Sequence, residues 1–168
     1  ILGMTIKGLE GKRVFATEKV DIEKEMYLSF TMDRKTKLGV MIFSPEGGVD
    51  INEIVEKNPD KVAKIILPAG EEIDDFNLQY VIDKTSLAKE YHDQFKDICR
   101  KLYRMYVRYD CLLAEINPLV ITKDGKLMAL DGKVDVDDNA LYRHKNIEEF
   151  RDDLTENALI RAARNFDL

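Results

Sequence analysis

The chain has 168 residues, of which 45% are hydrophobic and 35% are charged, which fits one globular domain or two small lobes. The sequence lacks an apolar run of about 18 residues, so it predicts no membrane-spanning helix. The formal net charge is −6, the opposite of the bias expected for a non-specific nucleic-acid binder. Two cysteines and two histidines without a CxxC motif exclude the usual structural zinc sites. We therefore expect Cys99 and Cys111 to be buried free thiols of a protein from a reducing compartment, the cytoplasm.

Short apolar segments alternate with helical ones along the chain. Strands are expected where apolar and β-branched residues gather between turn residues: 12–17, 25–32, 38–44, 62–67, 111–122 and 126–131. Helices are expected where apolar residues recur every three to four positions or where a charged segment closes on a breaker: 51–57, 86–108 and a charged tail over 146–165. Thr85 or Ser86 is a suitable N-cap for the long helix. The pattern predicts an α/β (α+β) fold with a mixed or antiparallel sheet and packed helices.

The strand over 111–122 contains two polar residues, Glu115 and Asn117, in an otherwise apolar run. A three-residue turn at 123–125 would pair Thr122 with Lys126, and the same register sets Asn117 directly opposite Asp131. Opposed residues project to one face with their Cβ atoms about 5 Å apart. Glu115 precedes Asn117 by two residues, so it is expected on that face too.

Grouping these polar side chains on one face is costly unless a charged ligand satisfies them. A carboxylate and an amide oxygen at this separation suit Mg²⁺, which completes its octahedron with phosphate and water. The spacing therefore points to a magnesium–nucleotide platform. A solvated polar face on an edge hairpin remains the alternative, and Pro118 is compatible with it.

Several ordered blocks resemble the β subunits of succinyl-CoA synthetases. They are Asp21–Leu28, Asp33–Arg34, Ser44–Ile51, Glu115–Val120, Leu130–Lys133 and Asp138–Arg143. The resemblance covers essentially the whole chain and implies an ATP-grasp fold. It implies that residues 1–168 form the C-terminal portion of that fold, with the N-terminal ATP-grasp lobe and the C-terminal CoA-ligase domain absent. The start at Ile1 and the end at Leu168 are then expected to be cuts inside a longer protein.

The resemblance also implies roles for individual residues. Asn117 and Asp131 match the family's Mg²⁺ ligands, and Glu25 matches the acidic residue that holds the nucleotide ribose. Main-chain groups of Thr17 to Val20 are expected at the adenine, where a departure from the family pattern leaves the choice between ADP and GDP open.

The catalytic role implied for Glu115 is to receive the phosphohistidine loop, whose histidine belongs to a partner α subunit. The implied reaction is the reversible joining of succinate and CoA at the expense of ATP or GTP, with Mg²⁺ as cofactor. Two rival interpretations stay open. One is a related acid–CoA ligase, acting on malate or citrate, and the other is a non-catalytic subunit-interaction domain that docks through a helix over 148–164. The Gly47–Gly48 pair is interpreted as a structural turn in preference to a phosphate contact.

Overall fold

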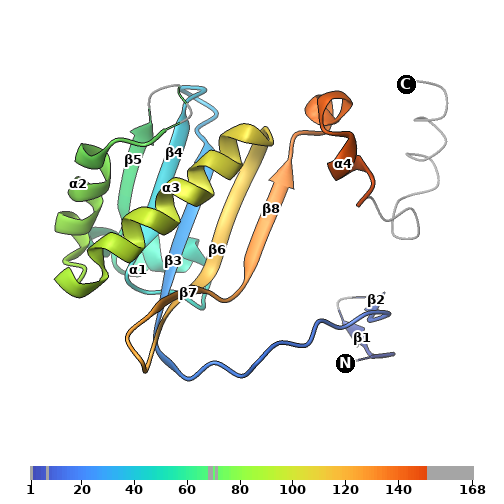
Figure 1. Cartoon of the computed structure of the whole chain (residues 1–168), viewed down its shortest axis with the longest axis horizontal. Coiled ribbons are helices and arrows are strands. Elements are labelled where there is room, and N and C mark those ends of the chain that lie inside the picture. The colour runs from blue at the N-terminus through green and yellow to red at the C-terminus, as the bar shows by residue number, and fades with distance from the viewer. Residues whose placement is uncertain (1, 7, 68–69, 71, 151–168) are drawn as a thin grey trace.

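The computed structural model describes residues 2–6, 8–67, 70 and 72–150 (Figure 1). Its strands, in chain order, are β1 (Thr5–Ile6), β2 (Leu9–Glu10), β3 (Ile22–Met32), β4 (Gly39–Ser44), β5 (Ala63–Leu67), β6 (Cys111–Thr122), β7 (Leu127–Ala129) and β8 (Gly132–Val136). Its α-helices are α1 (Ile51–Lys57), α2 (Asp75–Thr85), α3 (His92–Arg108) and α4 (Lys145–Glu148). Short 3₁₀ turns cover Pro59–Lys61, Lys89–Tyr91 and Asp138–Arg143. None of the described helices is both long and apolar enough to cross a membrane.

An antiparallel sheet is the centre of the described structure. Within the described residues it has six strands, five of them in the order β5-β4-β3-β6-β7. The sixth, β8, pairs with β6 as β7 does, but with the earlier part of β6. Every pairing in it is antiparallel, which confirms the expected class of sheet. Helices α2 and α3 lie across one face, and α1 lies behind the sheet in the same view (Figure 1).

The hydrophobic core lies between the sheet and α3. On β3, Met26, Leu28 and Phe30 alternate toward this side and are fully buried. The rings of Phe43 and Phe95 pack with their centroids 4.5 Å apart, which joins β4 to α3. Tyr27 and Ser29 alternate with Met26, Leu28 and Phe30 along β3, so they face the other side of the sheet. Polar side chains can gather on that side.

The long helix predicted from residue 86 begins later than expected. Ser86 has φ 52 and forms the C-cap of α2, and α3 starts at His92. Thr85, the other predicted N-cap, instead donates from its hydroxyl to the Val81 carbonyl at 2.8 Å. Helix α2 is not among the elements expected from the sequence, although Asp74 caps it by accepting from the Asn77 N–H at 2.8 Å.

Two other predicted elements also differ or lie outside the description. The strand expected over 12–17 is wrong, because residues 11–21 form no ladder and run as an exposed extended segment. Phe15 is 92% exposed there, so its strand-like composition has no neighbouring sheet edge to pair with. The tail helix expected over 146–165 lies mostly outside the described residues, and α4 is its described beginning.

The hairpin from β6 to β8 has the predicted register. The Gly125 N–H donates to the Thr122 carbonyl at 2.9 Å, and Gly125 has φ 78, a conformation that favours glycine. The Asn117 N–H donates to the Asp131 carbonyl at 3.1 Å, which sets these two residues opposite each other. The return strand is interrupted between β7 and β8 beside Pro118, which has no N–H to give to a ladder.

Candidate functional site

A β-bulge in β6 lies at the centre of the candidate site. Along β3 and β6, Leu28 pairs with Ile116, whereas Met26 pairs with Leu119. One β3 residue, Tyr27, is therefore opposite the two residues Asn117 and Pro118, whose peptide bond is cis. Such bulges bend a strand and redirect a side chain, and they are frequent beside active sites. Here the bulge sets Asn117 between β3 on one side and Asp131 on the other.

The Asn117 side chain is fixed by the backbone that follows β4. Its Oδ1 accepts from the Gly48 N–H at 3.0 Å, and its Nδ2 donates to the Val49 carbonyl at 3.2 Å. These bonds assign the amide orientation and leave Oδ1 one free lone pair. The half-buried amide is thus held in place and keeps an oxygen for a further partner.

The Gly47–Gly48 turn packs directly on β3. A Cβ on Gly47 would lie 2.3 Å from the carbonyl carbon of Met26, and a Cβ on Gly48 would lie 1.8 Å from Glu25 Oε2. Gly48 also has φ 74. The turn therefore requires glycine at both positions. Glu25 lies against Gly48, and the Gly48 N–H donates to Asn117. Its observed contacts are structural.

Both acidic neighbours of the glycine pair have structural partners. Glu46 pairs with Lys61 and accepts from the Asn58 side chain at 3.3 Å, and the Lys61 contact holds the pKa of this carboxyl below its usual value. Asp50 caps α1 by accepting from the Asn52 N–H at 2.9 Å. These carboxylates therefore have structural partners next to the turn.

Glu115 has a partner that the sequence did not reveal. The Tyr27 hydroxyl donates to Glu115 Oε2 at 2.8 Å across the sheet. Tyr27 is only 3% exposed, and burial together with the Glu115 carboxylate raises its pKa well above the usual value. The hydroxyl therefore stays protonated at neutral pH and remains a donor, which fixes one oxygen of Glu115 and leaves the other available.

Asp131 completes the arrangement from the return strand. Its Oδ1 accepts from the Gly132 N–H at 2.9 Å, and the side chain is exposed. Asn117 and Asp131 thus offer hard oxygen donors from directly opposed positions, and this chemistry fits Mg²⁺. In the described part of the chain, no group of three or more His, Cys, Asp and Glu side chains could hold a metal ion. A cation here would complete its coordination with oxygens of a ligand and water.

The predicted adenine contacts lie apart from this cluster in the description. Thr17 is exposed, and its hydroxyl donates only to the adjacent Glu18 carbonyl, at 3.2 Å. Val20 is half-buried at the end of the extended segment. The next residue, Asp21, accepts from the Lys123 N–H at 2.9 Å, which ties the segment to the hairpin turn. Among the described residues, no hydrogen bond joins Thr17 or Val20 to the bulge.

Comparison with known proteins agrees with this architecture. The family described as "ATP-grasp domain" matches residues 1–121. The chain belongs to the ATP-grasp family.

Two relatives of this ATP-grasp chain are β subunits of bacterial succinate–CoA ligases. Over its full length it is 41% identical to the succinate–CoA ligase [ADP-forming] subunit beta of Bacillus thuringiensis (strain Al Hakam), and equally to that of Bacillus cereus (strain AH187). The match covers 45% of each relative, so the chain spans less than half the length of the curated relatives it matches.

Solved structures support the fold. An ATP citrate lyase from Methanothrix soehngenii, solved with citrate and coenzyme A, matches 90% of this chain and 34% of its own, with a TM-score of 0.61 and 22% identity. The D541A mutant of the Methanosaeta concilii enzyme, solved with (3S)-citryl-CoA, matches 90% and 33% of the two chains at a TM-score of 0.59 and 20% identity. At these identities the likeness shows the ATP-grasp fold alone.

Two members of the candidate site are not predicted by the sequence. Tyr27 could have been found from the alternation of β3, since it shares a face with Glu25, but its pairing with Glu115 depends on a register between distant strands. Gly48 was noticed as part of a turn, and its contact with Asn117 joins positions 69 residues apart. Local spacing does not predict contacts of this kind.

Proposed function

We propose that this chain supplies the magnesium–nucleotide part of a succinate–CoA ligase β subunit. The observation that carries the proposal is the cluster at the bulge: the hairpin register sets Asn117 opposite Asp131, Asn117 accepts from the Gly48 N–H, and Glu25 lies against Gly48. Identity of 41% over the whole chain to β subunits supports the same assignment. The reaction would join succinate and CoA reversibly at the expense of ATP or GTP.

Each residue has a role in this proposal that its geometry allows. Asn117 Oδ1 and the Asp131 carboxylate would hold Mg²⁺, which would neutralise charge on the nucleotide phosphates. Glu25, whose carboxylate lies against the Gly48 backbone, would accept from the ribose hydroxyls. Main-chain groups from Thr17 to Val20 would contact the base, which leaves ADP and GDP as alternatives.

Glu115 would act toward the partner. With one oxygen held by Tyr27 at 2.8 Å, the other is free to orient a histidine ring, which for this family would be a phosphohistidine of the α subunit. The isolated chain would be inactive, because the N-terminal ATP-grasp lobe and the CoA-ligase domain would have to complete the site. A reducing, cytoplasmic location is consistent with Cys99 and Cys111, which are both buried and free, as the sequence predicts.

A metal titration tests the proposal. Mn²⁺ is a paramagnetic substitute for Mg²⁺, and we expect it to broaden the amide resonances of Gly48, Asn117 and Gly132 before others in the 168-residue chain. Asp131→Asn should weaken the apparent affinity at least about tenfold, since it removes the charge of the main ligand. Asp135→Asn is the matched control on β8, with the same change of charge at an exposed position, and should have no such effect.

Two results would contradict the assignment. Equal effects of Asp131→Asn and Asp135→Asn would show that Mn²⁺ responds only to the general acidity of the hairpin. Broadening without any preference for the bulge would favour the interaction-domain interpretation, whose proposed docking helix over 148–164 lies mostly outside the described residues. Within the complete ligase, succinate- and malate-dependent ADP formation would distinguish the related acid–CoA ligases.

A further inference from the structure

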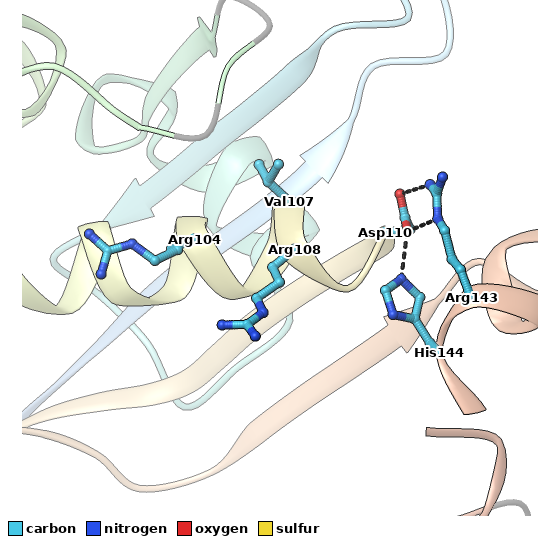
Figure 2. Close-up of a pocket in the computed structure, with 6 residues that line it drawn as sticks. All are labelled: Arg104, Val107, Arg108, Asp110, Arg143 and His144. Atoms are coloured by element: carbon cyan, nitrogen blue, oxygen red, sulfur yellow. Dashed lines mark hydrogen bonds and ion pairs between the residues drawn. The ribbon is translucent and has the colours of Figure 1, made fainter. Parts of the chain in front are cut away.

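A basic hollow lies at the C-terminal end of α3, on the start of β6 and away from the bulge. It has a volume of about 510 Å³ and is lined by Arg104, Val107, Arg108, Asp110, Arg143 and His144. The side chains come from two segments far apart in sequence, the end of α3 and the turn before α4 (Figure 2). Three arginines and one aspartate line it, in a chain whose net charge is −6. This group of six residues is called the arginine pocket below.

Asp110 fixes one wall of the arginine pocket. Its carboxylate accepts from Arg143 through both the Nε group, at 2.8 Å, and an Nη group, and His144 Nε2 lies 2.6 Å from Oδ2 (Figure 2). Its backbone is tied as well, since the Asp137 N–H donates to the Asp110 carbonyl at 2.9 Å. These bonds use two of the five N–H donors of Arg143, and its guanidinium also lies 5.9 Å from the centroid of the Tyr142 ring. The wall is therefore ordered in advance and still carries unused donors.

The opposite wall carries positive charge that the described structure does not balance. Basic residues recur at every fourth position of α3: Lys96, Arg100, Arg104 and Arg108. Asp75 lies 2.5 Å from Arg100 and 3.8 Å from Lys96, so it balances the first half of this row. Among the described residues, no ion pair joins Arg104 or Arg108 to a carboxylate, although Glu72 borders a smaller hollow beside Arg104. Like charges one helical turn apart destabilise a helix, and the guanidinium of Arg108 has the Tyr109 ring, with its centroid 5.9 Å away, as a partner in place of a carboxylate.

The spacing of the two guanidinium groups without a carboxylate partner indicates the ligand. Residues four apart on a helix have Cβ atoms about 5–6 Å apart and project to one side. In Figure 2 the side chains of Arg104 and Arg108 leave neighbouring turns of α3 and extend in different directions, so both would have to turn toward the hollow to share one ligand. A guanidinium fork matches the oxygens of one phosphoryl group in a bidentate manner. Two such forks one turn apart match two linked phosphoryl groups better than a single small anion.

We propose that the arginine pocket binds an anion of the diphosphate class, held by Arg104 and Arg108 on α3 and by the free donors of Arg143. This site is distinct from the bulge, and it depends on neither the metal ligands nor the family assignment. The anion would offset the repulsion along α3 and link that helix to the turn before α4.

Inorganic pyrophosphate, without added metal, is the probe for this site. We expect saturable changes in the amide NMR shifts of residues 104–110 and 143–144 of the 168-residue chain, with little change at Gly48 and Asn117. Arg104→Gln and Arg108→Gln should each weaken binding at least about fivefold, because each removes a charge-assisted pair. Arg108→Lys keeps the charge without the fork and should bind with intermediate affinity.

Arg34→Gln, in the turn between β3 and β4, is the control for the same loss of charge at an exposed residue. Equal weakening by this control would overturn the proposal, as would shifts that are absent from the arginine pocket. Sulfate that binds as tightly as pyrophosphate at equal ionic strength would overturn the diphosphate assignment. The unfolding midpoint of every variant is measured alongside, and Arg108→Lys gives the result if a glutamine variant does not fold.

Discussion

Replacing Gly47 by alanine tests the packing of the turn against β3. The added Cβ would lie 2.3 Å from both the carbonyl carbon and oxygen of Met26 and 2.7 Å from its Cα. All three are backbone atoms of a fully buried strand residue, so no flexible side chain can move aside to make room. The turn must shift by about 1 Å to restore normal carbon contacts. Overpacking of this kind costs about 2–3 kcal/mol of unfolding free energy.

Urea unfolding followed by circular dichroism measures this loss. For a chain of this size it corresponds to a fall of about 4–12 °C in the thermal midpoint. Gly70→Ala is the matched control, because nothing lies within 4 Å of its added Cβ and it does not have a positive φ. We expect the control to change stability by less than about 0.5 kcal/mol. The Gly48 amide resonance should also move in Gly47→Ala, since its 3.0 Å bond to Asn117 depends on the turn.

A Gly47→Ala variant as stable as the control would refute this reasoning. It would mean that the turn is not pressed on β3 in solution, and the contact between Gly48 and Asn117 would lose its structural support. A destabilised variant with an unchanged Gly48 resonance would separate the two effects and contradict the link between packing and the position of Asn117.

Three further predictions concern the core, the acid response and the thiols. Phe95→Ala should lower the unfolding free energy by about 3–5 kcal/mol in urea titrations, because Phe95 is fully buried against Phe43; a loss below 1 kcal/mol would contradict the described core. Hydrogen bonds from Arg143, and then from His144, hold the pKa of Asp110 below its usual value, so their stabilisation is present above the unfolded pKa of about 3.9 and is lost as pH falls through the folded pKa. Asn tolerates the left-handed backbone of position 110, where φ is 49. Asp110→Asn should therefore lower the unfolding free energy by about 1 kcal/mol at pH 7 and reduce the fall of the urea midpoint in acid. An acid response equal to that of the unchanged chain would refute this. Burial raises the pKa of both thiols, to about 11 for Cys111, so a thiol reagent at pH 8 should label them only as fast as the chain unfolds, and rapid labelling of the native chain would count against this.

The parts of the fold that the sequence predicted are mostly those that local chemistry determines. The positions of α1 and β6 and the register of the hairpin follow from nearby turn residues and apolar runs. The start of α3 was misplaced because Ser86 adopts a left-handed conformation and ends α2, a choice that its neighbours in sequence do not dictate. The strand expected over 12–17 failed because a strand also needs an available sheet edge.

The candidate site divides in the same way. The length of one turn predicts correctly that Asn117 lies opposite Asp131. The contact between Tyr27 and Glu115 depends instead on the pairing of two strands, because these residues are 88 positions apart in the sequence. Glu25 was singled out by resemblance alone, and the close approach of Gly48 gives it a physical setting. The long-range pairing of β3 with β6, and the bulge within it, are set by packing of the whole sheet.

The turn at Lys123–Gly125 also controls the geometry of the proposed magnesium ligands. Both oxygens come from one hairpin, so the distance between them is determined by loop length and not by the core. Adding one residue to this loop would slip the register and carry Asp131 to the opposite face, while β3 and β6 stayed paired as before. Loop length therefore affects the metal ligands and part of the core together, because the same slip would carry Leu127, which packs against the core, to the other face. Directed insertions in this turn, with position 127 repacked, offer a route to chains of this architecture that bind a different cation or none.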